Sequence, residues 1–445
     1  MRMQKYIFIV PLAVAFLIAA SAARADLVIK ITQGVSKPSP IAIVPFAWQG
    51  TGAASVDVAK VISDDLARSG LFAPLPVAKM LAQPTASADI NFDNWKAVDV
   101  NHLVIGSIAP TGENAELRFR LFNVYTSQQL LGYVLPTTTD KLRFIAHVVS
   151  DMVYQKLTGT PGAFATRIAY IEHAGSGKSE RWELVVADAD GANAQVVVKS
   201  PGLLMSPSWS PDGQRIAYVE FDGQQSHIYI QNVTTGARQS VLAREGINSA
   251  PAFSPDGKKL AVVLSTDPGN ADIYLLDLAS GKLQQLTSNP AIDTEPTWMP
   301  GGQAIVFTSD RGGSPQIYEM RIAGGQARRL SWDGSYNARP VVSPDGKSIA
   351  LVHREHGALR IGVLDPASGD LRLLTNGPLD RSPSFAPNGA LILYDALDQG
   401  QHVLETVSVD SRVREELSGP SGGLSQPTWG PFPPKPAARV ASGGL

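Results

Sequence analysis

The chain has no cysteine, almost no net charge and no long apolar run after its first 20 residues. Without cysteine it can form neither disulfide bonds nor a lipidated amino-terminal cysteine. The formal net charge is -2, and Lys and Arg are scattered, so no basic surface for nucleic acid is indicated. A hydrophobic content of 44% is typical of a folded protein, and 445 residues exceed one ordinary core. We therefore expect two domains.

The first 25 residues differ from the rest of the chain. Arg2 and Lys5 precede an apolar stretch at residues 7–20, and an A-x-A pattern follows at 23–25. This order predicts a secretory signal peptide at residues 1–25 that is cleaved from the mature chain. An uncleaved membrane anchor is the weaker alternative, because the stretch is shorter than the roughly 20 residues of a spanning helix and a proline interrupts it. We expect an exported, soluble protein.

A repeat fills the second part of the chain. Its units start at a proline and continue, in most copies, with an aromatic residue, an S-P-D-G-like turn and a short apolar run. The starts are residues 207, 251, 296, 340, 383 and 427. Proline fixes its own backbone angle and Asp-Gly tolerates positive φ, so the motif predicts a tight turn between two strands. Alternating residues and further turns indicate four short strands in each unit.

A period of about 44 residues with four strands is typical of a β-propeller blade. Helical repeats are excluded because Gly, Pro and Asp interrupt every unit too often for two helices. The last unit stops after one strand, whereas R-I-A-Y at residues 167–170 is a strand without its first neighbour. We expect the two ends to share one blade, with residues 427–429 as its innermost strand. This predicts a six-bladed β-propeller at residues 163–430.

Residues 26–160 lack the repeat and predict a small α/β domain with helical and strand patterns in alternation. The expected strands are 41–46, 102–108, 116–124 and 129–135, and the expected helices are 57–70 and 141–159. The fold class is thus two-domain, a small α/β amino-terminal domain followed by an all-β six-bladed β-propeller. Residues 431–445, rich in Pro, Ala and Gly, are expected to be disordered.

Residues 26–35 form a segment ahead of the first strand of the α/β domain. Leu27, Ile29 and Ile31 alternate with Lys30 and Thr32, and two prolines separate the segment from that strand. The pattern fits an edge strand of its own domain and, equally, a strand that is donated to a partner by β-augmentation. The candidate partner-binding residues of this segment are Asp26, Leu27, Val28, Ile29, Lys30, Ile31 and Thr32.

The loops that enter the innermost strands are the second candidate site. They precede the repeated prolines and should all emerge at one mouth of the propeller, opposite the S-P-D-G turns. For any single residue, a solvated loop is the simpler interpretation, so the hypothesis concerns the ring of loops as a whole. The candidate residues are Met205, Ser206, Ile247, Asn248, Ala250, Asp293, Thr294, Glu295, Asn337, Arg339, Asp380, Arg381 and Ser382.

Motifs for catalysis or cofactor binding are weak or missing. No G-x-S-x-G elbow occurs, and the sequence outside the propeller is too short for an α/β-hydrolase sheet. Residues 175–179 imitate the end of a phosphate-binding loop, but position 172 is Glu where that motif needs Gly. H-R-E-H at 353–356 lacks the order of H-E-x-x-H. We expect no enzyme activity, no cofactor and no metal site.

The aromatic residues of the repeat bear on an alternative function, a propeller that binds a small glycan or cell-wall ligand in its central channel. Such a protein would present aromatic side chains to the channel. Trp209, Phe253, Trp298, Phe385 and Trp429 instead recur at one place on the innermost strands, where packing between blades explains them.

Several motifs resemble the TolB family of periplasmic propeller proteins, and the resemblance covers nearly all of the mature chain. They are I-A-I-V-P-F at 41–46, K-L-T-G at 156–159, R-I-A-Y at 167–170, L-M-S-P-S-W-S-P-D-G at 204–213, A-P-A-F-S-P-D-G at 250–257 and D-T-E-P-T-W at 293–298. The S-P-D-G turn alone is less specific, because many propellers use it.

The resemblance implies a non-catalytic, monomeric scaffold of the Tol-Pal system. Such proteins bind the lipoprotein Pal over one mouth of the propeller and TolA through their amino-terminal segment, and bacteriocins and outer-membrane proteins are further partners. They support outer-membrane integrity and constriction at cell division. By similarity, Ala250 and Thr294 are positions of the Pal contact, and Ile247 stands where the family pattern leads us to expect His.

Overall fold

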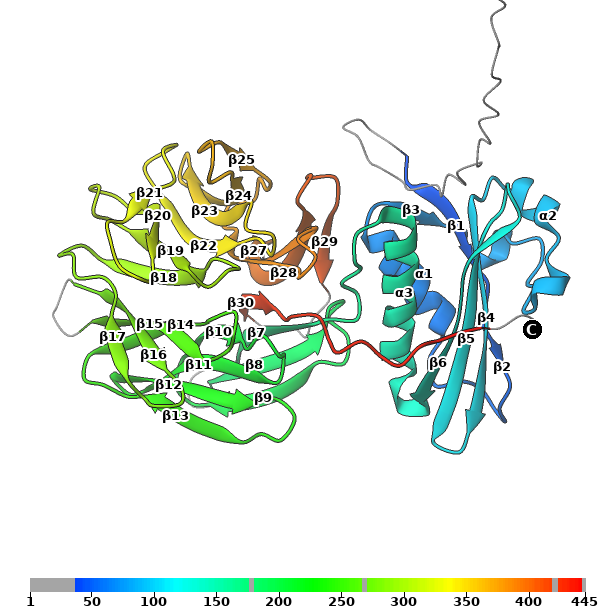
Figure 1. Cartoon of the computed structure of the whole chain (residues 1–445), viewed down its shortest axis with the longest axis horizontal. Coiled ribbons are helices and arrows are strands. Elements are labelled where there is room, and N and C mark those ends of the chain that lie inside the picture. The colour runs from blue at the N-terminus through cyan, green and yellow to red at the C-terminus, as the bar shows by residue number, and fades with distance from the viewer. Residues whose placement is uncertain (1–36, 176–179, 266–269, 418–422, 442–445) are drawn as a thin grey trace, which may run out of the picture.

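The computed structural model describes residues 37–441 except 176–179, 266–269 and 418–422 (Figure 1). The predicted signal peptide at 1–25 and the candidate segment Asp26 to Thr32 lie outside the described residues. No helix in the described part of the chain is long and apolar enough to cross a membrane.

The first domain is a mixed sheet with helices on both faces. Its strands are β1 (Ser39–Ile43), β2 (Ala47–Trp48), β3 (Phe72–Pro74), β4 (His102–Thr111), β5 (Asn114–Asn123) and β6 (Gln128–Thr138). Its helices are α1 (Val58–Arg68), α2 (Phe92–Lys96) and α3 (Leu142–Thr158), with 3-10 turns at Val77–Lys79, Ser87–Asp89 and Thr139–Lys141. The main strand order is β3-β1-β4-β5-β6-β31, where β31 (Arg439–Val440) comes from the carboxyl end of the chain.

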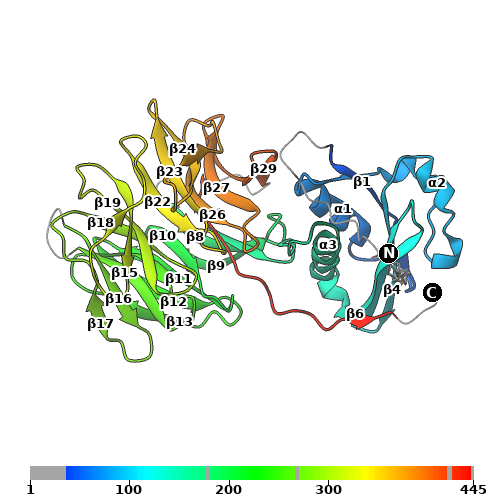
Figure 2. The same ribbon diagram turned by 45° about the horizontal axis from the view of Figure 1, so that its top comes forward.

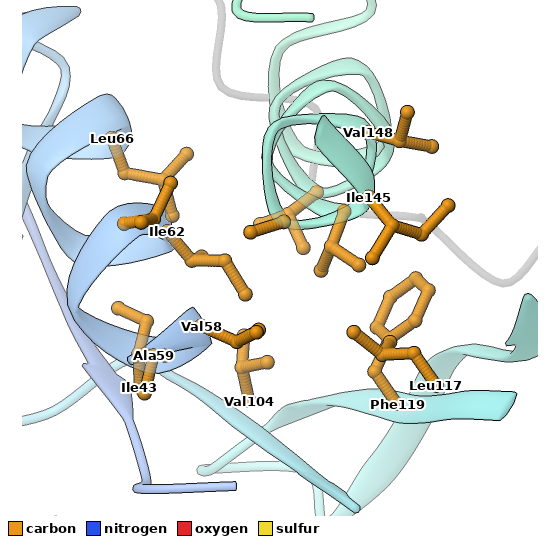
Figure 3. Close-up of a cluster of buried hydrophobic side chains, with 14 of the residues drawn as sticks. Ile43, Val58, Ala59, Ile62, Leu66, Val104, Leu117, Phe119, Ile145 and Val148 are labelled. Atoms are coloured by element: carbon orange, nitrogen blue, oxygen red, sulfur yellow. The ribbon is translucent and has the colours of Figure 1, made fainter. Parts of the chain in front are cut away.

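The helices form where the apolar spacing predicts them. Asp57 caps α1 by accepting a hydrogen bond from the Lys60 amide, and Gly159 ends α3 in the left-handed conformation, at φ 80°. The apolar stripes of α1 and α3 pack on one sheet face, where Ile62 and Ile145 belong to one buried cluster and Ile145 lies beside Phe119 (Figure 3). Both helices therefore lie between the sheet and the propeller (Figure 1).

The second domain consists of six four-stranded antiparallel sheets, which confirms the predicted six-bladed propeller. Blade 1 contains β10 (Leu204–Trp209), β11 (Arg215–Asp222), β12 (Gln225–Asn232) and β13 (Arg238–Leu242). Blade 2 contains β14 (Ile247–Phe253), β15 (Lys259–Ser265), β16 (Asp272–Asp277) and β17 (Leu283–Gln285). Blade 3 contains β18 (Asp293–Trp298), β19 (Ala304–Ser309), β20 (Gln316–Arg321) and β21 (Arg328–Arg329). Blade 4 contains β22 (Asn337–Val342), β23 (Ile349–Glu355), β24 (Ala358–Leu364) and β25 (Leu371–Leu373). Blade 5 contains β26 (Arg381–Phe385), β27 (Leu391–Asp398), β28 (Gln401–Ser408) and β29 (Arg414–Leu417).

Blade 6 is built from both ends of the propeller sequence, as the partial repeats predict. Its strands are β30 (Gly423–Trp429), β7 (Arg167–Ala174), β8 (Arg181–Asp188) and β9 (Gln195–Ser200), in that order across the sheet. The innermost strand β30 pairs antiparallel with β7, and Trp429 lies opposite Ile168. The Trp429 indole nitrogen also donates to Thr166 Oγ1 at 2.7 Å. The ring closes non-covalently through these contacts.

The S-P-D-G motif forms the predicted turn between the first two strands of a blade. In blade 2, the Gly257 amide donates to the Ser254 carbonyl at 2.8 Å, and Gly257 has a φ of +68°. The Ser254 hydroxyl donates to the Asp256 carboxylate at 2.6 Å, and that carboxylate accepts from the Lys258 amide at 3.1 Å. We call the end of the propeller that carries these turns the turn face.

The amino-terminal domain packs on the turn face beside blades 5 and 6. The Asn388 amide, in the turn of blade 5, donates to the Pro161 carbonyl at 3.0 Å. Arg68 of α1 donates to the carbonyl of Ala189, just after β8, at 3.4 Å. The opposite end of the propeller, where the innermost strands begin, carries no contact with this domain among the described residues, and we call it the entry mouth.

The carboxyl-terminal residues return from the propeller to the first domain (Figure 2). Arg439 and Val440 pair antiparallel with Val134 and Tyr133 of β6, and the Ala441 amide donates to the Gly132 carbonyl at 3.0 Å. The prediction of a disordered tail is therefore wrong for residues 431–441. Composition alone suggested disorder, but the free edge of β6 supplies backbone hydrogen bonds to the tail.

Candidate functional site: the entry mouth of the propeller

The entry mouth is formed by a bulge that recurs in every innermost strand. Each of these strands shifts register around an Xaa-Pro pair. The residue before the proline has a φ between 47° and 55° in all six blades. These residues are Ser206, Ala250, Glu295, Arg339, Ser382 and Gln426. Non-glycine residues at positive φ cost on the order of 1–3 kcal/mol each. Recurrence in every blade shows that the propeller architecture itself imposes this conformation.

The expectation that the candidate residues lie in loops is wrong for all but Asp380. The innermost strands begin before the bulge, so Met205 pairs with Val219 and Ile247 pairs with Ser265. The repeated proline, which has no N–H, does not begin the strand, because ladder pairs form on both sides of the bulge.

The bulges surround the end of the central channel. The six Xaa-Pro pairs and the residue after each proline line a cavity of about 260 Å³. Five of its members were predicted: Ser206, Ala250, Glu295, Arg339 and Ser382. Gln426 of blade 6 was missed, although its place before Pro427, the last repeat start, is the same. The sequence therefore identified the ring, except for its closing member.

Hydrogen bonds between blades fix the side chains of this ring. Glu295 accepts from the Arg339 amide at 2.8 Å and pairs with the Arg339 guanidinium at 3.2 Å. Arg339 also donates to the Ser382 hydroxyl at 2.6 Å, so blades 3, 4 and 5 are connected. Gln426 of blade 6 accepts from the Ser206 amide of blade 1 at 2.8 Å. The mouth is thus a pre-arranged polar surface, and its one Glu and one Arg neutralise each other.

Four candidate residues support the mouth from inside. The side chains of Asn248, Asp293, Asn337 and Asp380 are fully buried. Asn248 donates to the Arg244 and Ser226 carbonyls, and Asp293 accepts two hydrogen bonds from Arg311 at 2.8 and 2.9 Å. They hold the preceding loops in place and cannot touch a partner in this conformation.

The remaining candidates differ in exposure. Ile247 is 51% exposed, whereas Met205 and Thr294 are half-buried. Arg381 is half-buried and pairs with Asp395 at 3.0 Å. Ile292, directly before β18, is 41% exposed and was missed, because it lies outside the repeated positions. Ile247 and Ile292 thus add apolar surface from blades 2 and 3 to the polar ring.

The five repeated aromatic residues lie between blades, as predicted. Trp298 of blade 3, for example, packs among Ala261, Val263 and Ile273 of blade 2, and its indole nitrogen donates to the Ala252 carbonyl at 3.0 Å. The mouth cavity, by contrast, is lined by prolines and by small or polar side chains. Among the described residues, the channel mouth therefore presents no aromatic side chain of the kind that binds sugars.

These features define a two-domain β-propeller protein in which the described residues of an α/β domain cover part of one face and make no contact with the opposite mouth. Models of the TolB beta propeller domain and the TolB amino-terminal domain match residues 154–433 and 27–130. The chain belongs to the TolB family.

Relatives and a solved structure agree with this assignment. The chain is 43% identical to the Tol-Pal system protein TolB of Bordetella pertussis, over 95% of this chain and 94% of that protein. It is 45% identical to the Tol-Pal system protein TolB of Thioalkalivibrio sulfidiphilus, over 92% and 95%. The crystal structure of TolB from Acinetobacter baumannii matches with a TM-score of 0.82 and 38% identity, covering 89% of this chain and 98% of that one.

Proposed function

We propose that the chain is a non-catalytic scaffold of the Tol-Pal system in the periplasm, exported across the inner membrane by a signal peptide, residues 1–25, that is then cleaved off. The entry mouth binds the lipoprotein Pal, and the segment from Asp26 to Thr32 binds TolA. Through these two contacts the protein supports outer-membrane integrity and constriction at cell division. Membership of the TolB family supports the assignment to the Tol-Pal system, and the geometry of the entry mouth supports the contact with Pal.

The observation that carries the Pal proposal is the free entry mouth. The amino-terminal part of the chain contacts the turn face, where Asn388 of blade 5 donates to the Pro161 carbonyl and Arg68 of α1 donates to the Ala189 carbonyl. A partner can therefore reach the opposite end of the propeller without displacing the amino-terminal domain. The mouth is also held rigid by bonds between blades, so little side-chain ordering opposes binding. Ala250 and Thr294, which by similarity are positions of the family's Pal contact, belong to the innermost strands of neighbouring blades at this mouth.

Substitutions at the mouth test this proposal. We expect Thr294→Arg and Ile247→Asp each to weaken Pal binding at least about tenfold, equivalent to roughly 1.4 kcal/mol, measured by calorimetry with purified Pal. Ile247 is half exposed, so its substitution should leave the melting temperature unchanged. Lys347→Glu, an exposed change on the turn face, is the matched control and should bind normally. Unaltered Pal affinity in the folded mouth variants would remove the case for this mouth.

A separate experiment tests the TolA contact. Deletion of residues 26–32 from the mature chain should abolish capture of TolA and leave Pal affinity unchanged, because the residues that line the mouth cavity all belong to the innermost strands of the propeller. Retained TolA binding would show that TolA contacts another surface.

A glycan ligand in the channel is the alternative function. A pull-down from envelope extract with the purified chain distinguishes the two functions. A scaffold should recover a lipoprotein and a TolA-like chain, whereas a glycan-binding propeller should recover cell-wall fragments. The small and polar lining of the cavity favours the scaffold.

A further inference from the structure

A buried histidine lies at the junction of the two domains. His147 of α3 is only 1% exposed, and its Nδ1 lies 2.7 Å from Asp65 Oδ2 of α1. Its Nε2 is directed at the propeller, 3.9 Å from Asp190 Oδ2 in the turn after β8. Nε2 is buried and has no hydrogen-bond partner in the structure. One imidazole ring thus lies between a carboxylate of its own domain and a carboxylate of the other.

Other charged groups surround this histidine on every side. Arg68 pairs with Asp65 at 2.9 Å, and Arg143 pairs with Asp190 and, at 3.4 Å, with Asp188. The titratable and charged groups around the histidine are Asp65 and Arg68 from α1, Arg143 and Asp151 from α3, Asp188 at the end of β8, Asp190 in the turn that follows, and Lys141, Arg167 and Asp212 at the neighbouring cavity. Glu415 of β29 interacts with Asp65, Arg68 and Asp190 of this group. The junction is therefore a network of charges from both domains.

The protonation state of the ring decides how many bonds it can make. A neutral imidazole has one N–H, whereas an imidazolium donates from both nitrogens. In the charged form Nδ1 donates to Asp65 and Nε2 can donate to Asp190, in a charge-assisted bond of about 2.8 Å. In the neutral form with the proton on Nδ1, the Nε2 lone pair faces the Asp190 carboxylate and repels it. Charging His147 thus adds an attraction between the domains.

Asp65, His147 and Asp190 are also close enough together to invite comparison with a cation site. Both carboxylates, however, already pair with guanidinium groups, from Arg68 and Arg143. A divalent ion would have to displace these arginines, whereas a proton on the ring needs no displacement. The arrangement therefore suits a proton.

We propose that His147 is a pH-sensitive latch that joins the amino-terminal domain to the propeller by bridging Asp65 and Asp190 when it is protonated. The latch holds the two domains in one orientation at mildly acidic pH and releases them at higher pH. This inference concerns the domain junction alone and does not depend on which partners bind the mouth or the amino-terminal segment.

The electrostatic surroundings agree with this direction. Burial opposes the charged ring, but the Asp65 hydrogen bond and the charges of Asp65, Asp190 and Asp188 outweigh burial and raise the pKa of His147 above 6.5. A histidine whose pKa is raised on folding contributes stability that is fully present below the unfolded value and is lost as pH rises through the folded value. The latch is therefore expected to be closed below about pH 6.5 and open at alkaline pH.

Histidine titration by NMR tests the bridge directly. The chain has 7 histidines, and the signal of His147 is the one that His147→Gln removes. In the full chain its pKa should lie above the ordinary value, and Asp190→Asn should lower it by about one unit or more. The amide keeps the hydrogen bond that Asp190 Oδ1 accepts from the Ala192 amide, so the turn should persist. An unchanged pKa in Asp190→Asn would overturn the proposal.

Distance measurements between the domains test the latch itself. The chain has no cysteine, so spin labels can be placed at Lys60→Cys on α1 and Lys347→Cys on blade 4, both exposed. In the unmodified background the distance distribution should be narrow at pH 6 and broader at pH 8.5. His147→Gln and Asp190→Asn should abolish this response, and His356→Asn, at an exposed histidine, should keep it.

Arg143→Gln is a second control, because it removes an ion pair across the same junction without touching the titrating ring. We expect it to retain a pH response. A distribution that does not change with pH in the parent chain, or a response that persists in His147→Gln, contradicts the latch. Sharpening by added Zn²⁺ at pH 8.5 would also contradict it, because a metal would then join the domains.

Discussion

At the scale of single residues, the repeated aromatic side chains explain why the blades adhere. Trp298 is 8% exposed, packs on blade 2 and donates to the Ala252 carbonyl. Trp209 of blade 1 makes the equivalent contact, through a hydrogen bond to the Thr428 carbonyl of blade 6, whereas Trp429 donates to the Thr166 hydroxyl just before β7 of its own blade. Trp209 and Trp298 therefore combine apolar burial with one hydrogen bond across a blade boundary.

Trp298→Ala should destabilise the propeller by about 3–5 kcal/mol, because it leaves a cavity between blades 2 and 3. Trp298→Phe keeps most of the ring and should cost less, since it loses the hydrogen bond and only part of the packing. Urea unfolding followed by tryptophan fluorescence and circular dichroism measures both. Equal losses in the two variants would contradict the assignment of most of the energy to packing.

Asp151 gives a second prediction at this scale. It accepts hydrogen bonds from the amides of Phe164 and Ala165 at 2.7 and 3.3 Å, which fixes the start of the propeller against α3. Burial raises its pKa from 3.8 to about 7, despite these bonds. The folded state therefore binds the proton more strongly than the unfolded state, and stability falls as pH rises from about 4 through about 7.

Asp151→Asn removes this titration and should flatten the decline of the melting temperature between pH 5 and pH 8. The pKa of His147 is also raised on folding, so its titration lowers stability in the same direction and part of the decline with pH should remain. Asp151→Ala is the contrasting variant, because it loses both amide bonds, whereas Asn keeps one oxygen acceptor for them, and it should melt lower at every pH. A slope in Asp151→Asn equal to that of the parent chain would contradict the raised pKa.

At the scale of elements, the S-P-D-G turns contact one another around the turn face. A Cβ on Gly257 would lie 3.3 Å from the ring of Pro211 in the turn of blade 1, and one on Gly346 would lie 3.4 Å from Pro300 in blade 3. Gly213 of blade 1 has the same relation to Pro431, at 3.2 Å, where the tail begins. The proline and the glycine of the motif thus serve contacts between blades as well as the turn.

Gly257→Ala tests this contact against backbone strain. Gly236, in another hairpin of blade 1, has a similar φ of +73° but nothing within 4 Å of its Cβ position. Both alanine variants should lose about 1–2 kcal/mol through the left-handed conformation. Gly257→Ala should lose more, because its methyl group also crowds Pro211. Equal losses in denaturant unfolding would show that the neighbouring proline yields without cost.

Periodicity predicted most of these elements because its signals are local. Turn chemistry and strand alternation lie within each unit, so the blades and the shared blade 6 followed from the sequence. The buried roles of Asn248 and Asp293 could not be predicted, since their partners lie elsewhere in the sequence, Ser226 in β12 and Arg311 in the turn after β19. The pairing of β31 depends on the free edge of β6 and has no pattern of its own.

At the scale of the whole molecule, the two domains are joined in three ways. The chain passes directly from α3 into β7, the His147 network bridges α1, α3 and the blade 6 turn, and the tail returns to β6 (Figure 2). The tail also covers a cavity of about 370 Å³ between the domains, lined by His147, Trp209 and Pro431 among others. The tail thus contacts both the sheet edge and the surroundings of the latch.

Removal of residues 432–445 should therefore expose the edge of β6. The amides of Gly132 and Val134, which face the tail, should exchange hydrogen at least about tenfold faster, whereas the central strand β4 should be unaffected, because it is paired on both sides. A chain that ends after Ala441 retains the pairing of Arg439 and Val440 and serves as the control. Mass spectrometry of peptic peptides from β6 measures the difference. Equal exchange in the two truncated chains would show that the tail does not protect this edge, and its pairing would then contribute nothing to the junction of the domains.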